Sequence, residues 1–283
     1  MEHFADRLLA ACAAKGAGVC VGIDPVLDKL PRALRELGDP VEAIRRFGVG
    51  VIDASAPSVP AVKLQAACFE RYGGAGFDAM LQLTRYGRQR GLLVILDAKR
   101  GDIGVSSDHY AAALAEGDAV TVAPYMGDDS LLPFIEPAAA ARRGVYVLER
   151  TRNPGGDALQ TLRLADGRTV SEAVAALAAK LGDACVGSSG YSAVGAVVGA
   201  TKASEAAALR ALMPRQVFLV PGYGAQGAGA DDVRACFDAR GQGAIVTASR
   251  SVIYAFHDGD GDWRDAVGAA AATLRDEVRA AVA

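Results

Sequence analysis

Hydrophobic residues are concentrated in short, almost continuous apolar runs that recur along the chain. Longer segments rich in Ala, Leu and Arg separate these runs. Continuous apolar runs are typical of parallel strands that are buried on both faces. We therefore predict eight strands, at Val19–Ile23, Ala61–Leu64, Leu92–Leu96, Ala119–Ala123, Val145–Leu148, Gly195–Val198, Val217–Val220 and Ala244–Thr247.

The segments between the runs place apolar residues three and four positions apart, which predicts amphipathic helices. The clearest are Phe77–Arg90, Val170–Leu181, Ala203–Leu212 and Asp231–Ala239, with Trp263–Val282 as a closing helix. Regular alternation of strands and helices predicts the α/β class and one domain over residues 1–283, a single (β/α)8 (TIM) barrel. A doubly wound open sheet is the alternative, but eight evenly spaced strands favour closure.

Two connections are longer than the others and contain several Pro and Gly residues. They cover residues 25–40, after the first predicted strand, and 152–169, after the fifth. Both follow the carboxyl end of a strand, which in a barrel is the end that carries the active site. We expect both excursions to lie on the active-site face.

Composition narrows the function classes. The 283 residues are 51% hydrophobic and carry a net charge of −3, with no basic stretch suited to nucleic acid or to a membrane surface. The apolar run Leu8–Cys12 is too short for a leader and no basic segment precedes it, so we expect a cytoplasmic protein. Five dispersed cysteines and three histidines predict reduced thiols and no metal site.

Charged residues occur where the first three predicted strands end. Asp24 follows the first strand, Lys63 lies in the second, and Asp97, Lys99 and Asp102 follow the third. Because the carboxyl ends of barrel strands share one face, we expect these side chains to converge.

Each of these residues has an ordinary structural interpretation when taken alone. An aspartate before proline is a common turn former, and a charged pair at a strand end contributes little. However, Lys63 lies inside an apolar run, where an ammonium needs a charged partner. Asp97 and Lys99 are two residues apart and would share one strand face. Together they predict a preorganised electrostatic site that needs no metal.

A second cluster has the features of a phosphate site. The stretch 221–229 after the seventh predicted strand is rich in glycine, and Ser249–Arg250–Ser251 follows the eighth, with Ser249 as a predicted helix N-cap. Barrels commonly bind phosphate with the loops after these two strands and the N-terminus of a short helix.

These motifs resemble the orotidine 5′-phosphate decarboxylase family in its longer bacterial form. The run Asp97-x-Lys99-x-x-Asp102 is similar to the family's central signature, which sister decarboxylases and synthases share. The more specific resemblance is the ordered set, which spans nearly the whole chain. Its other members are Gly22–Pro25, Val62–Lys63, Val198–Thr201, Pro221–Gly222 with Gln226–Gly227, and Ser249–Ser251.

The resemblance implies decarboxylation of orotidine 5′-monophosphate to UMP and CO2, the last step of de novo pyrimidine nucleotide synthesis, without a cofactor. Lys99 would protonate C6 of the pyrimidine, with Asp97 and Lys63 completing a charged network. Asp102 would come from the neighbouring subunit of a homodimer, and Ser106 would reach across likewise.

The remaining roles that the resemblance implies concern substrate binding. Asp24 and Lys63 would bind the ribose hydroxyls, while Gln226 and Arg250 would hold the 5′-phosphate. Tyr223 would belong to a closing loop.

The chain departs from the family pattern at the loop after the fifth predicted strand. A serine that contacts the pyrimidine commonly precedes the Asn-Pro of this loop, but here Arg152 precedes Asn153–Pro154. Either Thr151 replaces that serine or Arg152 turns to solvent. We expect Asn153 still to shape the loop and to contact substrate.

Three other functions remain open from the residues. A metal-dependent sugar-phosphate decarboxylase or aldolase would use the carboxylates to hold Mg²⁺. A Schiff-base aldolase would use Lys63 or Lys99 as a nucleophile, although neighbouring carboxylates make such lysines poor nucleophiles. A non-catalytic binder of phosphate-bearing ligands is the third.

Overall fold

The computed structural model describes residues 2–199, 203–223, 230–257 and 261–283. Its eight strands are parallel, each pairs with the next, and β8 returns to pair with β1, so the sheet is a closed barrel. This confirms the predicted fold and excludes the open sheet. The strands are β1 (Val19–Ile23), β2 (Ala61–Gln65), β3 (Leu93–Arg100), β4 (Ala119–Val122), β5 (Gly144–Arg150), β6 (Ser192–Val198), β7 (Gln216–Pro221) and β8 (Ala244–Ala248).

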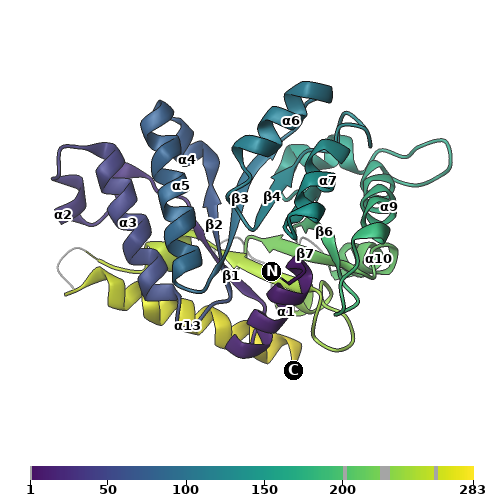
Figure 1. Ribbon diagram of the computed structural model, residues 1–283. Coiled ribbons are helices and arrows are strands. Elements are labelled where there is room, and N and C mark those ends of the chain that lie inside the picture. Colours follow the sequence, from purple (N-terminus) through teal and green to yellow (C-terminus); the bar gives the residue numbers. More distant parts are fainter. Residues whose placement is uncertain (1, 200–202, 224–229, 258–260) are drawn as a thin grey trace.

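Helices surround the barrel on its outside (Figure 1). The α-helices are α1 (Phe4–Lys15), α2 (Arg32–Arg35), α3 (Pro40–Ser55), α4 (Ala66–Glu70), α5 (Gly73–Gln89), α6 (Gly104–Ala113), α7 (Leu132–Ala140), α8 (Asp157–Gln160), α9 (Val170–Gly182), α10 (Ala203–Leu212), α11 (Ala230–Arg234), α12 (Arg250–Ile253) and α13 (Trp263–Val282). Three short 3₁₀ turns are η1 (Leu27–Lys29), η2 (Pro154–Gly156) and η3 (Asp183–Cys185).

The predicted helix Asp231–Ala239 is wrong at its C-terminal end, because α11 ends at Arg234. Beyond it the carboxylate of Asp238 accepts hydrogen bonds from the backbone N–H groups of Arg240 and Gln242. A side chain that binds nearby backbone in this way stabilises a turn at the expense of a helix.

Apolar side chains form two packed layers. Those that point out of the barrel pack against the helices, as Val62 and Val94 do. Those that point inward fill the barrel interior, among them Cys20, Ile95 and Tyr146. The eight strands are therefore buried on both faces, which is why their sequences are almost uninterrupted apolar runs.

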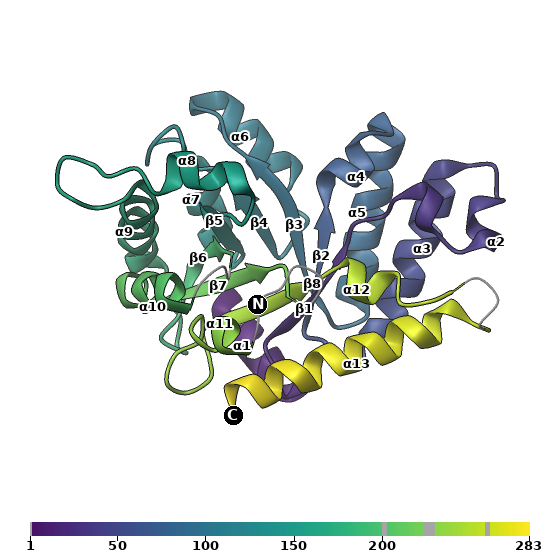
Figure 2. The same ribbon diagram turned by 180° about the vertical axis from the view of Figure 1, so that it is seen from behind.

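Helix α1 closes the amino-terminal end of the barrel. Phe4 packs edge-to-face on Tyr146, with ring centroids 6.1 Å apart, and a side chain at Gly144 would collide with it. On the outside, α13 packs along α3 (Figures 1 and 2), where Trp263 stacks on Phe47 with ring centroids 5.1 Å apart.

The two long excursions contain short helices. The first carries η1 and α2 before α3 begins at Pro40, and the second carries η2 and α8 before α9 begins at Val170. Tyr254 ties the start of the first excursion to the end of α12, because its hydroxyl donates to the Asp24 carbonyl and accepts from the Val26 N–H.

Candidate active site

A cavity of about 420 Å³ opens at the carboxyl ends of the strands. Its wall is built from the ends of β1, β2, β3, β5, β6, β7 and β8 and from residues that follow several of them. Six of the predicted site residues line it, namely Asp24, Lys63, Asp97, Lys99, Asn153 and Arg250. The structure therefore brings together the charged cluster and the Arg250 side of the predicted phosphate site.

Asp97 bridges the two lysines of this cavity. Its Oδ2 lies 2.8 Å from Lys63 Nζ and its Oδ1 lies 2.5 Å from Lys99 Nζ. Asp24 Oδ1 lies further away, 3.7 Å from Lys63 Nζ. Lys63 and Asp97 are almost completely buried, so their charges act with little screening by solvent.

The paired charges keep each other ionised. Burial opposes the charged form of Lys63, but Asp24 and Asp97 outweigh burial and raise the pKa of its ammonium above the ordinary value. Burial also opposes the Asp97 carboxylate, yet Lys63 and Lys99 more than offset it and hold its pKa well below the usual range. Lys63 and Asp97 are therefore both charged at neutral pH.

The backbone at Lys99 departs from a regular strand. Its φ is +46°, in the left-handed region that non-glycine residues rarely adopt. The pairing of β3 with β4 shifts register between Leu96 and Arg100. The side chains of Asp97 and Lys99 do meet as predicted, but through this irregularity and not through simple strand alternation.

Sequence reasoning missed Thr121 on β4. Its buried hydroxyl donates to Asp97 Oδ1 at 2.8 Å and accepts from the Lys99 N–H at 3.0 Å. No signal in the sequence singles it out, because a threonine within an apolar strand is commonplace.

Asp102 and Ser106 do not line the cavity. The Asp102 carboxylate accepts a hydrogen bond from the Ile103 N–H at 2.8 Å, and Ser106 is exposed on α6. Within this chain, the structure leaves both outside the charged cluster.

The predicted phosphate side is only partly described. Arg250, Ser251, Gly222 and Tyr223 line the cavity, whereas Gln226 lies outside the described residues. Ser249 occupies the N-cap position of α12 as predicted, but its side chain makes no capping bond.

The reason for the missing cap lies on the neighbouring strand. The Ser249 hydroxyl lies directly over Gly22 of β1. A side chain at position 22 would collide with this hydroxyl. The hydroxyl is therefore turned toward β1 and away from the first turn of the helix.

Arg152 does not turn to solvent. It lines the cavity, its Nη1 donates to the Gly222 carbonyl, and its stem crosses the end of β6 where only Gly199 leaves room. Thr151 also lines the cavity, in keeping with the alternative in which it replaces the missing serine. Arg152 thus joins the loop after β5 to the loop after β7.

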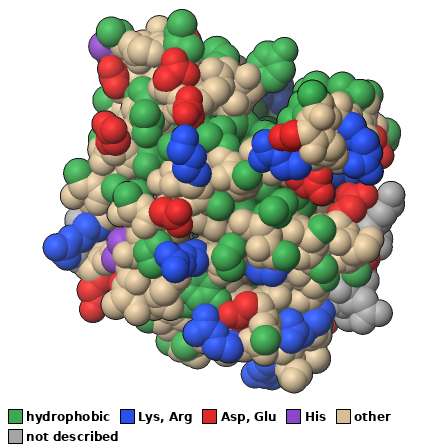
Figure 3. Space-filling view, turned by 90° about the vertical axis from the view of Figure 1, so that its right-hand side faces the viewer, with side chains coloured by type: hydrophobic (Ala, Val, Ile, Leu, Met, Phe, Trp, Pro, Cys, Tyr) green, Lys and Arg blue, Asp and Glu red, His purple; other side chains and the backbone are tan. Residues whose placement is uncertain are grey.

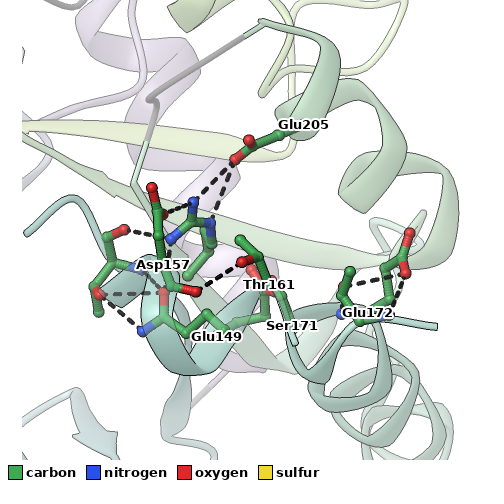
Figure 4. A network of polar contacts seen from close by, with 10 residues as sticks. Glu149, Asp157, Thr161, Ser171, Glu172 and Glu205 are labelled. Atoms are coloured by element: carbon green, nitrogen blue, oxygen red, sulfur yellow. Dashed lines mark hydrogen bonds and ion pairs between the residues drawn. The ribbon is translucent and has the colours of Figure 1, made fainter. Parts of the chain in front are cut away.

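Arg150 anchors the loop that carries Asn153, through partners that include Asp157 and Glu205, both labelled in Figure 4. Its guanidinium pairs with Asp157 at 2.5 Å and with Glu205 at 3.3 Å, and it donates to Gln160 Oε1 at 2.9 Å. These contacts tie the end of β5 to α8 and α10, so the excursion after β5 is held firmly against the barrel.

Glu149 lies behind this network, on the outer face of β5. Its Oε1 accepts a hydrogen bond from the Ser171 hydroxyl of α9, while its buried Oε2 has no hydrogen-bond partner among the described residues. Burial raises the pKa of Glu149 to about 8, against the opposing influence of Ser171 and Arg150.

Two kinds of feature are absent from the described residues, a membrane-spanning helix and a cluster of metal ligands. None of their helices combines the length and the apolar character needed to cross a membrane. No group of three or more His, Cys, Asp or Glu side chains is arranged there to hold a metal ion.

Known proteins resemble this chain over its full length. Residues 19–260 match the model of the Orotidine 5′-phosphate decarboxylase / HUMPS family. The chain is 41% identical to orotidine 5′-phosphate decarboxylase of Rhodopirellula baltica, over 99% of this chain and 100% of that one. It is 40% identical to the Deinococcus radiodurans enzyme of the same name, over 99% and 98%.

A solved structure agrees with the sequence relatives. Leishmania donovani OMP decarboxylase superposes with a TM-score of 0.80 and 33% identity, over 99% of this chain and 98% of that one. The resemblance indicated by the ordered motifs is thereby confirmed. The closed barrel carries a charged Lys-Asp-Lys cluster at its mouth, in agreement with these matches. Because the family model covers most of the chain and the relatives are about 40% identical over nearly its full length, the chain belongs to the orotidine 5′-phosphate decarboxylase family.

Proposed function

We propose that the chain decarboxylates orotidine 5′-monophosphate to UMP and CO2, with Lys99 as the general acid. The observation that carries the proposal is the ammonium of Lys99 held 2.5 Å from the Asp97 carboxylate at the cavity wall. This placement provides a positive charge and a proton donor at one point, which is what the reaction requires.

Loss of CO2 leaves an electron pair on C6 of the pyrimidine ring. A fixed ammonium stabilises that developing negative charge electrostatically and then quenches it by proton transfer. Lys63 keeps Asp97 ionised and in place, so Asp97 in turn holds Lys99. The product carbon receives the proton of Lys99, and solvent then reprotonates the amine.

Asp24 and Lys63 bind the ribose hydroxyls in this proposal. Asp24 Oδ1 is buried and accepts no hydrogen bond from the described residues. A buried carboxylate oxygen without a donor is costly. A ribose hydroxyl entering the cavity would supply the donor.

Arg250 binds the 5′-phosphate, together with Gln226 from outside the described residues. Arg250 lies in the first turn of α12, between Ser249 and Ser251, and all three line the cavity. A guanidinium suits a phosphate because it donates two parallel hydrogen bonds. Tyr223, at the start of the loop after β7, lines the same side.

Asn153 and the two residues before it face the pyrimidine. All three line the cavity from the loop after β5, opposite the α12 side. The Asn153 side chain carries an amide that can donate to a ring carbonyl and accept from a ring N–H, so we assign recognition of the base to this loop.

The active unit is a homodimer in which Asp102 and Ser106 complete the neighbouring site. Neither residue lines the cavity of its own chain. Large apolar side chains are exposed nearby, on α6 and the residue before it, on the segment that leads to α7, and at the first residue of α7, as expected of a protein interface. They are Ile103, Val105, Tyr110, Tyr125, Met126 and Leu132.

Residues 1–283 act as one domain in this proposal, with the excursions 25–40 and 152–169 on the side of the cavity. Their first residues adjoin lining positions on β1 and β5. The chain serves the last step of de novo UMP synthesis in the cytoplasm.

The direct test is the loss of orotidine 5′-monophosphate absorbance with purified protein, in EDTA and without added cofactor. We expect turnover, with UMP and CO2 formed in equal amounts. Turnover that requires an added divalent cation would instead support the metal-dependent alternative. A borohydride-trapped adduct with a carbonyl substrate would support the Schiff-base aldolase, and binding of UMP without turnover would indicate a binder.

A further inference from the structure

Thr121 lies behind the Lys-Asp-Lys cluster without lining the cavity. It is completely buried on β4, so its hydroxyl reaches neither solvent nor substrate. Its two hydrogen bonds instead connect the two residues on which the chemistry depends, Asp97 through its carboxylate and Lys99 through its backbone N–H.

The register of the sheet explains why a side chain is needed at this point. Leu96 pairs with Val120 and Arg100 pairs with Val122, so three residues of β3 face one residue of β4. A bulged strand leaves backbone groups without ladder partners. The Thr121 hydroxyl accepts the N–H of Lys99, which the irregular ladder would otherwise leave without an acceptor.

The backbone conformation of Lys99 adds to this requirement. Its φ of +46° is disfavoured for a residue with a side chain, and such a conformation persists only where its surroundings hold it. The hydrogen bond from its N–H to Thr121 is one of the contacts that do so.

The Asp97 carboxylate is fixed by the same hydroxyl. Its Oδ2 receives Lys63, and its Oδ1 receives both Lys99 Nζ and the Thr121 hydroxyl. Removal of the hydroxyl leaves the carboxylate held by the two lysines alone, so Oδ1 loses its contact with β4 and can shift. The ammonium of Lys99 would then follow the carboxylate away from its position at the cavity wall.

We propose that Thr121 is a positioning residue, whose hydroxyl sets the Lys99 backbone and the Asp97 carboxylate so that the ammonium faces the reacting carbon. This inference rests on the proposed function of Lys99. Thr121 acts through its neighbours and touches no substrate, so it should affect the chemical step more than binding.

The test compares two substitutions that separate the hydroxyl from the methyl group. Thr121→Val keeps the branched shape and removes the hydroxyl, whereas Thr121→Ser keeps the hydroxyl. We expect Val to lower kcat roughly 10- to 100-fold, as small displacements of reacting groups do. KM and UMP affinity should change by less than about threefold, because remote binding groups are untouched. Ser should retain most of kcat.

Thr84→Val is the matched control. Thr84 is equally buried, and its hydroxyl donates to the Met80 carbonyl within α5, on the outside of the barrel. Thr84→Val removes a buried threonine hydroxyl that does not contact the Lys-Asp-Lys cluster, so its kcat should equal that of the wild type. Thr121→Ala supplies a second hydroxyl-free variant if the valine protein does not fold.

Two readouts separate this inference from the proposed function. Crystal structures of the variants should show Lys99 leaving its left-handed conformation, or its contact with Asp97 lengthening, when the hydroxyl is absent. Wild-type kcat in Thr121→Val, equal loss in Ser and Val, or unchanged geometry at Lys99 would each overturn the role of Thr121. Absence of turnover in the wild type would instead refute the function, with the crystal structures still deciding the role of the hydroxyl.

Discussion

Lys99 and Asp97 differ in their exposure, and the difference suits their roles. The Lys99 side chain is 39% exposed toward the cavity, whereas that of Asp97 is 8% exposed. The buried carboxylate therefore serves as a fixed anchor, and the more accessible ammonium can reach a substrate.

Lys99→Ala should lower kcat by at least roughly 10²- to 10⁴-fold, the usual contribution of a positioned acid. UMP affinity should change little, because the phosphate and ribose contacts remain. Turnover and UMP binding by calorimetry measure the two effects. Lys180→Ala, which removes a lysine that is 75% exposed on α9, is the control. Near-normal turnover in Lys99→Ala would exclude this lysine as the proton donor.

Arg250→Ala should weaken UMP binding about 10- to 100-fold, as expected for loss of a charged hydrogen-bond donor. Uridine, which lacks the phosphate, should bind almost as before. Calorimetry with both ligands measures the difference, and Arg46→Ala on the outer helix α3 controls for loss of a positive charge. Equal losses for UMP and uridine would contradict a phosphate contact.

Strand β5 makes polar side-chain contacts with neighbouring elements on both of its faces. Arg150 lines the cavity. Glu149 packs outward against Ser171 in the first turn of α9 (Figure 4). The inner contacts position the loop for substrate. The outer contact involves a carboxyl group that keeps its proton at neutral pH, which makes the stability of this element dependent on pH.

Glu149→Gln should flatten the pH dependence of stability between about pH 4.5 and 8. In this window the unfolded chain has released the Glu149 proton, whereas the folded protein, with a pKa of about 8, retains it. The free energy of unfolding therefore falls as pH rises through the window and levels off above it. Glutamine cannot ionise, so this contribution to the slope disappears.

Thermal melting from pH 5 to pH 9 measures the effect. At pH 8 the melting temperature of the variant should exceed that of the wild type by roughly 2–4 °C for each kcal/mol that the ionisable Glu149 costs the folded protein. Glu36→Gln, at an exposed surface pair with Arg32, should leave the slope almost unchanged. Parallel melting curves for wild type and Glu149→Gln across the whole range would contradict the assignment.

Most strand positions could be predicted because burial on both faces demands apolar runs. The end of β3 could not, because Asp97 and Lys99 interrupt its apolar run while the strand continues to Arg100. Charged site residues were predictable because they lie at the carboxyl ends of strands. Thr121 was not, since its partners come from the neighbouring strand and only the bulge in β3 creates the need for its hydroxyl.

The whole molecule has mixed surface charge and a local apolar region. Acidic and basic side chains lie interspersed on the face shown in Figure 3. One group of exposed apolar residues lies on and beside α6, where Val105 is 69% exposed and Tyr125 is 85% exposed. A second copy of the chain covering this region would bury both and bring Asp102 to another cavity.

Mixing of inactive Lys99→Ala and Asp102→Ala subunits should restore activity. In a heterodimer, the cavity with the intact Lys99 receives the intact Asp102 from its partner, so one site is complete. Co-expression with two different affinity tags isolates the heterodimers, and turnover measures recovery. Inactive heterodimers, with both parental variants folded, would mean that each site is complete within one chain.

The packing beneath the cavity also determines how the products leave. Side chains fill the barrel interior and α1 closes its far end, so CO2 has no axial route. The gas must depart through the same mouth by which the nucleotide entered, past a UMP that is still bound. CO2 can return to substrate only while UMP remains in the cavity, so a slow nucleotide exit favours incorporation of labelled CO2 and a fast exit makes loss of the gas irreversible.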